Sequence, residues 1–411
     1  MDEMKIIGPF KQLTALADLP LRGAIADEQL EVIAKGAVVV NSDGLIEAVG
    51  EFETLRTSYP TAKLEEIEEP MVLMPGFIDC HTHIAFGGSR ARDYAMRVAG
   101  KTYLEIAKAG GGIWDTVTQT RSATEEELIK NTVSRAAKHL REGVTTIEVK
   151  SGYGLNVDDE IKILNAIHSA NQLTKADLIS TCLAAHMKPK DFDGGQKEYL
   201  NYLLDELLPL VKEQKLSERI DIFVEDSAFD TVHADYFLSK VAQLGFDIAV
   251  HADQFSTGGS ALALKHKARS ADHLEASTEK EIEPFVSSDT VAVVLPGASV
   301  GLGMNFAPAR KLLDAGACMA IASDWNPGSA PMGSLLVQAS ILGAFEKLSM
   351  TETLAGLTYR AAHALNLKDR GKIKKGYLAD MQAFPCEDYR EILYHQGQLK
   401  PQIIWKTGTR I

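Results

Sequence analysis

Two histidines one residue apart, His81 and His83, are the first side chains in this sequence whose spacing suggests chemistry. They follow the apolar run 72–78, which reads as a buried strand, and side chains two apart on a strand point to the same side. Such a pair can offer two imidazoles to one metal ion without bending the backbone. Two surface histidines in a turn are the alternative, but the strand before them favours a metal site.

Two polar residues at the ends of other apolar runs supply further candidate ligands. His251 closes the run 246–250, and Asp324 closes the run 319–323. With the first two histidines they make three nitrogens and one carboxylate, a set that leaves a position open for water, as hydrolytic metal sites require. Alone, His251 reads equally well as a core histidine and Asp324 as a helix N-cap. Together they predict one bound metal ion, either zinc or iron, because this ligand set suits both.

Hydrolysis also needs groups that move protons, and Asp324 and His273 are the candidates. His273 ends a short strand-like run, titrates in the useful pH range and can donate a hydrogen bond to a carbonyl oxygen. The alternative for His273 is a structural histidine tied to Asp272 or Glu275.

A single metal ion is favoured over two. Barrel hydrolases with two metals usually bridge them through a modified lysine on the fourth strand, and the corresponding run here, 221–225, contains no lysine. Lys150 ends the second run instead, which is the wrong place for such a bridge.

Eight apolar runs alternate with helical segments between residues 73 and 367. They end near residues 80, 149, 184, 225, 251, 273, 295 and 323. Residues typical of helix ends lie between these runs, such as Thr124 and Glu127, which can form a capping box. The pattern predicts an α/β fold, a (β/α)8 TIM-like barrel with its active site at the C-terminal strand ends. A doubly wound sheet is the alternative, but it predicts one crevice, whereas polar residues close nearly every run.

Both ends of the chain contain short strand-like runs rather than alternating units. Residues 1–72 and 368–411 therefore predict one small, β-sandwich-like domain assembled from the two termini, beside a barrel over 73–367.

The bulk composition predicts a soluble cytoplasmic protein with a small-molecule substrate. A net charge of −13 argues against nucleic acid or an anionic membrane as the main partner. The first residues do not resemble a signal peptide, and no apolar run approaches the roughly 20 residues that span a bilayer. Four cysteines without paired spacing (Cys80, Cys182, Cys318 and Cys386) read as reduced thiols. By strand parity, Cys80 is expected to face the helices rather than the metal.

Beyond the ligand set, several motifs make the chain resemble a known family. The ligands alone resemble the amidohydrolase superfamily. Arg90, the Glu-Val-Lys-Ser-Gly-Tyr-Gly run at 148–154 and the Asp-Trp-Asn-Pro-Gly-Ser turn at 324–329 are more specific, and they resemble the imidazolonepropionase family within it. Further matching stretches lie at 86–90, 109–113, 251–254 and 270–275.

The resemblance implies an activity, a substrate and an assembly. The family opens the ring of 4-imidazolone-5-propanoate to give N-formimidoyl-L-glutamate in histidine degradation. Arg90 would clamp the propanoate carboxylate in a bidentate geometry that lysine cannot reproduce. The resemblance also suggests a homodimer. The other expected substrate contacts are Tyr153, His186, Gln254, Asn326, Gly328 and Ser329.

Gln254 departs from those family members that carry glutamate at this position. A glutamine can orient a ring nitrogen or a water molecule, but it cannot accept a proton. We therefore expect Gln254 to assist catalysis and substrate binding, while proton transfer rests on Asp324 and His273. The glycine run 110–112 does not fit a nucleotide-binding loop and predicts a mobile loop near the mouth.

Two other functions remain open at this stage. A nucleobase deaminase or another cyclic-amide hydrolase could use the same ligands, although neutral bases need no partner such as Arg90. A non-catalytic scaffold is the alternative from a different class, and it should purify without metal.

Overall fold

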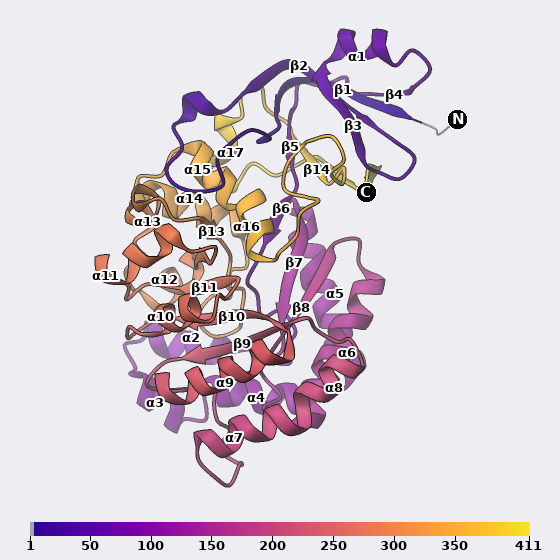
Figure 1. Cartoon of the computed structure of the whole chain (residues 1–411). Helices are drawn as coiled ribbons and strands as arrows, with labels where there is room; N and C mark the ends of the chain where they lie inside the picture. Colours follow the sequence, from indigo (N-terminus) through magenta and orange to yellow (C-terminus); the bar gives the residue numbers. More distant parts are fainter. Residues whose placement is uncertain (1–3) are drawn as a thin grey trace.

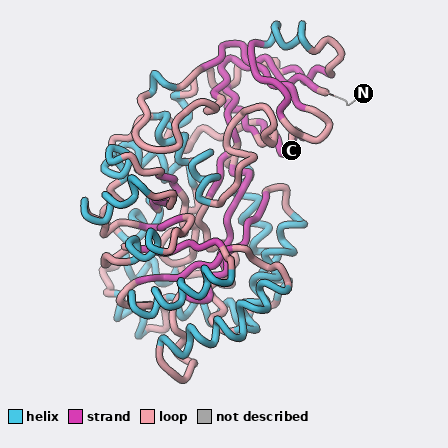
Figure 2. The backbone as a smooth tube through the Cα atoms, viewed as in Figure 1, coloured by secondary structure: helices cyan, strands magenta, loops and turns pink. Residues whose placement is uncertain are grey.

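The computed structural model describes residues 4–411, and all but three of their side chains, those of residues 103, 104 and 107. Two sheets organise the chain: a barrel in the lower part of Figure 1 and a smaller sheet above it, where both ends of the chain lie. Figure 2 shows helices surrounding the barrel strands, whereas the small sheet carries the short helix α1 (Phe52–Ser58) at its outer end.

Eight parallel strands form the barrel, and each is hydrogen-bonded to the next in chain order. All eight lie where the alternating pattern predicted them, which confirms the barrel. A doubly wound sheet is excluded, because its strand order reverses at a switch point. The strands are β6 (Phe77–Asp79), β7 (Val144–Lys150), β8 (Asp177–Ala185), β9 (Arg219–Val224), β10 (Asp247–Ala252), β11 (Ser270–His273), β12 (Val291–Val294) and β13 (Met319–Ile321).

The first and last barrel strands are joined by the segments that follow them. Thr82 and Trp325 form a parallel bridge. The backbone N–H of His83 donates to the Trp325 carbonyl at 2.9 Å, and that of Asp324 donates to the His81 carbonyl at 3.0 Å. The same backbone pairing that closes the barrel therefore brings three predicted metal ligands together at its C-terminal end.

Helices cover the barrel, and their ends follow the expected signals. Thr124 and Glu127 form the predicted capping box at the start of α5, with N–H···O distances of 2.9 and 3.2 Å. Gly316, with φ of 96°, ends α13 in the left-handed conformation that favours glycine. The helices are α2 (Ala91–Val98), α3 (Tyr103–Lys108), α4 (Ile113–Ser122), α5 (Glu125–Arg141), α6 (Val157–Leu173), α7 (Gln196–Tyr202), α8 (Leu208–Glu213), α9 (Thr231–Leu244), α10 (Gly259–Lys265), α11 (Glu279–Ile282), α12 (Pro296–Leu302), α13 (Ala309–Ala315), α14 (Leu335–Glu346), α15 (Met350–Gly356), α16 (Tyr359–Ala364) and α17 (Arg390–Tyr394).

The small sheet is mixed and draws strands from both ends of the chain. Its strands are joined by hydrogen bonds into one sheet with apolar clusters on both faces: Ile7 and Val38 belong to one cluster, Ile6 and Val39 to the other. This alternation follows the period of two along a strand. The strands are β1 (Lys5–Thr14), β2 (Val32–Val40), β3 (Ile46–Glu51), β4 (Lys63–Glu66), β5 (Val72–Pro75), β14 (Met381–Phe384), β15 (Ile403–Lys406) and β16 (Thr409–Arg410).

Parts of both terminal regions also pack on the barrel. Leu16, Ile25 and Ile392 are buried in the large barrel cluster rather than under the small sheet. The backbone N–H of Ile25 donates to Glu352, which also binds Arg310 at 2.8 and 3.0 Å. The domain boundaries at 72 and 368 stay a prediction, because residues on both sides of them share one core.

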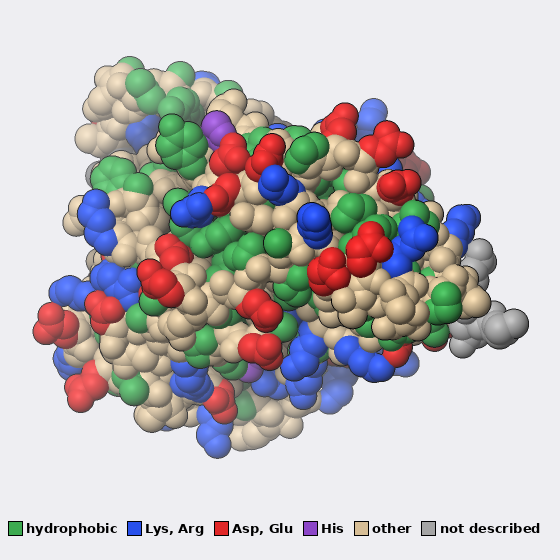
Figure 3. Space-filling model, turned by 90° about the horizontal axis from the view of Figure 1, so that it is seen from above, with side chains coloured by type: hydrophobic (Ala, Val, Ile, Leu, Met, Phe, Trp, Pro, Cys, Tyr) green, Lys and Arg blue, Asp and Glu red, His purple; other side chains and the backbone are tan. Residues whose placement is uncertain are grey.

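All four cysteines are free and buried, and Cys80 packs in a cluster with Cys318 and Ala362, away from the metal ligands as its parity predicted. Within residues 4–411, no helix is both long and apolar enough to cross a membrane. On the face shown in Figure 3, acidic and basic side chains are interspersed.

Candidate active site

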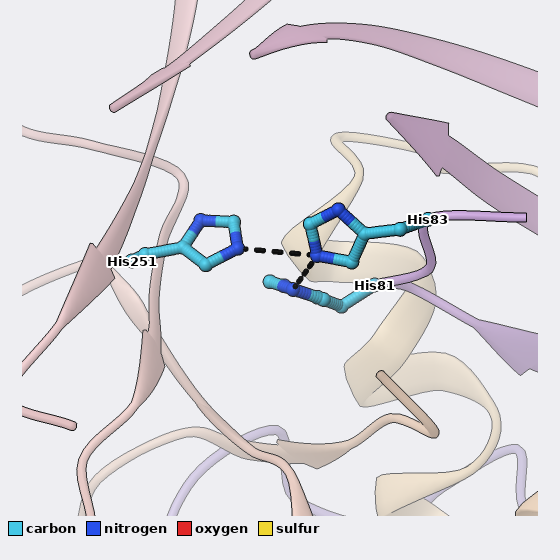
Figure 4. A group of neighbouring side chains, drawn as sticks. All are labelled: His81, His83 and His251. Atoms are coloured by element: carbon cyan, nitrogen blue, oxygen red, sulfur yellow. Dashed lines mark hydrogen bonds between the residues drawn. The ribbon is translucent and has the colours of Figure 1, made fainter. Parts of the chain in front are cut away.

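Three of the predicted metal ligands form a buried cluster at the mouth of the barrel (Figure 4). The Nε2 atom of His83 lies 3.3 Å from Nε2 of both His81 and His251. Oδ1 of Asp324 lies 3.3 Å from Nε2 of His83 and 3.5 Å from Nε2 of His81. The structure thus brings all four predicted ligands within reach of one point.

The tautomers of these histidines determine what the cluster can bind. Nδ1 of His81 lies 2.6 Å from Oδ2 of Asp272, and Nδ1 of His251 lies 3.0 Å from Oδ2 of Asp221. A proton held on each Nδ1 leaves the Nε2 lone pairs facing one another, an arrangement that is unfavourable unless a cation lies between them. The donor set therefore fits a divalent metal ion.

Burial and neighbouring charges shift the pKa values of the four candidate ligand side chains away from their ordinary values. Burial and Lys150 disfavour the charged form of His81, but its hydrogen bond to Asp272 raises the pKa of His81 to about 9. Burial lowers the pKa of His83 to about 4 and that of His251 well below the usual histidine range. Burial alone would raise the pKa of Asp324, but hydrogen bonds from His81 and His83 hold it well below its usual range. Without a cation among the ligands, the cluster therefore holds a proton on His81, beside an anionic Asp324 and the neutral imidazoles of His83 and His251.

Trp325 fixes the segment that carries Asp324. Its ring packs edge-on against His139, 4.8 Å between centroids, and Lys138 lies 4.8 Å from the same ring. A glycine is required at position 333, because a Cβ atom there would lie 2.2 Å from the indole. The Asp324 backbone itself adopts a positive φ of 51°, which is strained for a residue other than glycine and marks a constrained position.

A cavity of about 600 Å³ opens onto this cluster. Every predicted site residue except His81 lines it, and His81 lies just behind, fully buried. Two cations that the sequence reasoning missed, Arg97 and Lys101, also line it. The predicted residues along its wall are His83, Arg90, Tyr153, His186, His251, Gln254, His273, Asp324, Asn326, Gly328 and Ser329.

Arg90 is held in the cavity wall by Asp93, a buried residue that sequence reasoning also missed. Nε of Arg90 donates to Oδ2 of Asp93 at 2.7 Å, and the same oxygen accepts the backbone N–H of Gly112 at 2.8 Å. A Cβ atom on Gly111 would lie 2.3 Å from Oδ1 of Asp93. The glycine run thus packs around this carboxylate, and its interpretation as a mobile loop stays a prediction.

His273 is oriented by Glu275. Its Nδ1 lies 3.3 Å from Oε2 of Glu275, whereas Asp272, the other partner considered from the sequence, binds His81 instead. The adjacent loop with Gln254 is also fixed, because the backbone N–H of Phe255 donates to Glu225 at 2.9 Å. The closeness of His273 and Glu275 along the chain was the one feature of the sequence that indicated this pair.

His186 and Tyr153 occupy the wall beside His83. Nδ1 of His186 lies 3.0 Å from the Gly152 carbonyl oxygen, and its ring stacks on His83 with centroids 5.5 Å apart. Burial lowers the pKa of His186 to about 4 and raises that of the Tyr153 hydroxyl above its usual range. Both side chains are therefore neutral hydrogen-bonding groups at physiological pH.

Asn326 is used differently from the expectation. Its Nδ2 donates to the Asp324 carbonyl at 2.7 Å and to Ser329 Oγ at 2.8 Å, while its Oδ1 accepts the backbone N–H groups of Gly328 and Ser329, both at 2.8 Å. These donors are occupied inside the turn, and a contact between Asn326 and the substrate stays a prediction. Gly328 instead gives room to Arg90, since a Cβ atom there would lie 2.7 Å from Nη1.

The comparisons with known proteins agree with this site. The amidohydrolase family matches residues 106–393. An imidazolonepropionase of Bacillus cytotoxicus is 40% identical over 388 residues, which cover 93% of this chain and 90% of the relative. An imidazolonepropionase of Bacillus mycoides is 40% identical over 384 residues, with 92% and 89% covered. The chain belongs to the imidazolonepropionase family of amidohydrolases.

Solved structures with much lower identity share the fold of this imidazolonepropionase family member. A zinc-bound adenosine deaminase from Xanthomonas campestris superimposes with a TM-score of 0.72 at 19% identity, covering 100% of this chain and 92% of that one. A triazine hydrolase variant gives 0.75 at 15% identity, with 99% and 94% covered. At such identities these likenesses concern the architecture alone.

Proposed function

We propose that this protein is an imidazolonepropionase, which hydrolyses the ring C–N bond of 4-imidazolone-5-propanoate to N-formimidoyl-L-glutamate. One observation carries the proposal: the three-histidine, one-aspartate cluster and the guanidinium of Arg90 line the same cavity. A cluster of that kind suits hydrolysis of an amide, and the guanidinium suits a substrate with a carboxylate tail. The curated relatives at 40% identity support the same activity.

His81, His83, His251 and Asp324 would hold the metal, while the proton transfer and the hydrogen bond to the substrate carbonyl would come from Asp324 and His273. When bound, a divalent ion supplies an acidified water molecule and polarises the substrate carbonyl. Asp324 accepts a proton from the attacking water, and His273 donates a hydrogen bond to the carbonyl oxygen as negative charge develops there. The ring C–N bond then breaks, and the proton passes to the leaving nitrogen, which becomes part of the amidine.

The remaining side chains position the substrate. Arg90 pairs with the propanoate carboxylate, while the neutral groups of Tyr153 and His186 hydrogen-bond the carboxylate or the ring. Gln254 orients the ring nitrogen or the water through its amide. With these roles the reaction needs no base at position 254, because Asp324 is already an anion beside the three histidines.

The identity of the metal, the assembly and the compartment are also parts of the proposal. Zinc or iron, one ion per subunit, suits the nitrogen-rich ligand set. Elemental analysis of the purified protein tests the metal. Light scattering tests the homodimer expected from the family resemblance. The four buried thiols suit a cytoplasmic location, which fractionation of the native host tests.

The decisive experiment is a hydrolysis panel combined with metal analysis. The protein is incubated with 4-imidazolone-5-propanoate, hydantoin-5-propanoate, guanine and cytosine. We expect turnover of imidazolonepropanoate and about one bound metal ion per chain. Turnover of a nucleobase without turnover of imidazolonepropanoate would overturn the proposal in favour of a deaminase. A metal-free, inactive protein would favour a scaffold.

A further inference from the structure

Three carboxylates lie beneath the metal ligands, and each contacts a different part of the ligand set. Asp272 binds Nδ1 of His81 at 2.6 Å, and Asp221 lies 3.0 Å from Nδ1 of His251. Glu148 accepts the backbone N–H of Thr82, the residue between the two paired histidines, at 3.0 Å. The orientation of two ligands, and of the backbone between His81 and His83, therefore depends on three buried acids.

One ammonium group lies among these acids. Nζ of Lys150 lies 2.8 Å from Oε1 of Glu148, 2.9 Å from Oδ2 of Asp221 and 3.9 Å from Oδ2 of Asp272. Lys150 is fully buried, as are Glu148 and Asp221, and Asp272 is 1% exposed. Its backbone N–H also donates to the Thr82 carbonyl at 3.0 Å.

The position of this cluster in the barrel explains the geometry. Glu148 and Lys150 come from β7, Asp221 from β9 and Asp272 from β11. Side chains from alternate strands of a barrel fill the same interior layer, which is usually made of branched apolar residues. Here that layer is charged, and it lies directly below the metal ligands.

Buried carboxylates at this separation repel one another, and burying each of them is costly unless it is paired with a cation. If Asp272 or Asp221 were displaced, the imidazole that it contacts would be less firmly held, and the histidine Nε2 would be less well placed to bind a metal. A cation among the three acids opposes this repulsion. Burial alone would lower the pKa of Lys150, but Asp221, Glu148 and Asp272 raise it above the usual lysine range, so the group is charged.

We propose that Lys150 is a positioning residue for the metal centre: its ammonium holds the carboxylates of Glu148, Asp221 and Asp272 in place, and these in turn fix His81, Thr82 and His251. The inference rests on the proposed metal site. It gives a role to a lysine that lies on the second strand of the barrel, not on the fourth strand, from which a lysine that bridges two metals would come.

Lys150→Met tests the inference by removing the charge while keeping a similar length. Lys406→Met is the matched control, because Nζ of Lys406 also joins two carboxylates, Asp177 at 2.7 Å and Asp380 at 2.5 Å, but beside the small sheet. Zinc affinity is measured by competition with a chromophoric chelator, and the visible spectrum of the cobalt-loaded protein reports ligand geometry. We expect a 10- to 100-fold weaker zinc affinity and an altered cobalt spectrum for Lys150→Met, with neither change in the control.

A second variant keeps the inference testable if Lys150→Met does not fold. Glu148→Gln combined with Lys150→Met removes one charge of each sign, and it should still weaken zinc binding, because Asp221 and Asp272 lose their cation. Wild-type zinc affinity and an unchanged spectrum in either folded Lys150 variant would overturn the inference. Equal weakening in the Lys406 control would also overturn it, as a general stability effect. A wild-type protein that binds no metal would instead overturn the proposed function.

Discussion

The Arg90 guanidinium Nε and the Asp93 carboxylate Oδ2 lie 2.7 Å apart, with Asp93 only 1% exposed. Because Nε is held, the terminal guanidinium nitrogens are presented to the cavity in one orientation. Asp93 is in turn fixed by the Gly112 backbone. The substrate carboxylate would therefore meet a preorganised cation rather than a flexible surface arginine.

Asp93→Asn should weaken substrate use through Arg90. Hydrogen bonds to charged groups contribute about 1.5–3 kcal/mol, so kcat/KM should fall roughly 10-fold or more, mainly through a higher KM. Steady-state kinetics with imidazolonepropanoate measure this. Asp115→Asn, on the neighbouring helix α4, is the control and should leave KM unchanged. A normal KM for Asp93→Asn would mean that Arg90 does not depend on this pair.

His273→Ala should reduce kcat by 10²-fold or more, because it removes the hydrogen-bond donor to the developing oxyanion. Gln254→Ala should reduce kcat only modestly, since an amide cannot accept a proton. Metal content, measured for both, should stay at the wild-type level. Comparable rates in the two variants would contradict the assignment of proton transfer to His273 and Asp324.

Removing the metal should abolish activity without unfolding the chain. The barrel has a large apolar core, and the ligand cluster occupies only its mouth. Dialysis against a chelator is therefore expected to leave the circular dichroism spectrum intact while lowering the Tm, because a ligand that binds only the folded state stabilises it. Adding zinc or ferrous iron should restore turnover. An unfolded apoprotein would instead give the metal a structural role.

Glu352→Gln should reduce stability in a pH-dependent way. Glu352 is buried and binds Arg310 and the backbone of Ile25. Burial alone would raise its pKa, but the hydrogen bonds from Arg310, Ser349 and Ile25 lower the pKa of this carboxyl below 4.5. Its folded-state pKa is thus below the unfolded value, so its contribution is present above about pH 4.5 and is lost as the pH falls through the folded-state pKa.

Chemical denaturation of the metal-free protein measures that contribution. At pH 7 the variant should be less stable than wild type by about 1–3 kcal/mol, as expected for a lost charge-assisted hydrogen bond. The gap should narrow as the pH is lowered towards 3. A gap that is constant with pH would show that the carboxylate charge does not carry the effect.

The sequence by itself determined the barrel and the candidate metal ligands. Strand periodicity and helix punctuation are local properties, so eight strand ends could be placed from the chain alone. Because parallel strands of a barrel end on the same face, His81, His83, His251 and Asp324 were expected to meet there, and they do. Arg90 followed from its position seven residues beyond His83.

Only the tertiary structure decided what surrounds those residues. Periodicity gives the direction of a side chain from its strand but not its neighbour across the barrel, so the pairing of Asp272 with His81 and the place of Lys150 among three acids could not be read from spacing. Asp93 pairs with Arg90 three residues away on the chain, but it contacts Gly112 only because α2 lies against the loop before α4. Local pattern fixed which residues reach the mouth, and contacts between distant segments fixed how they are held there.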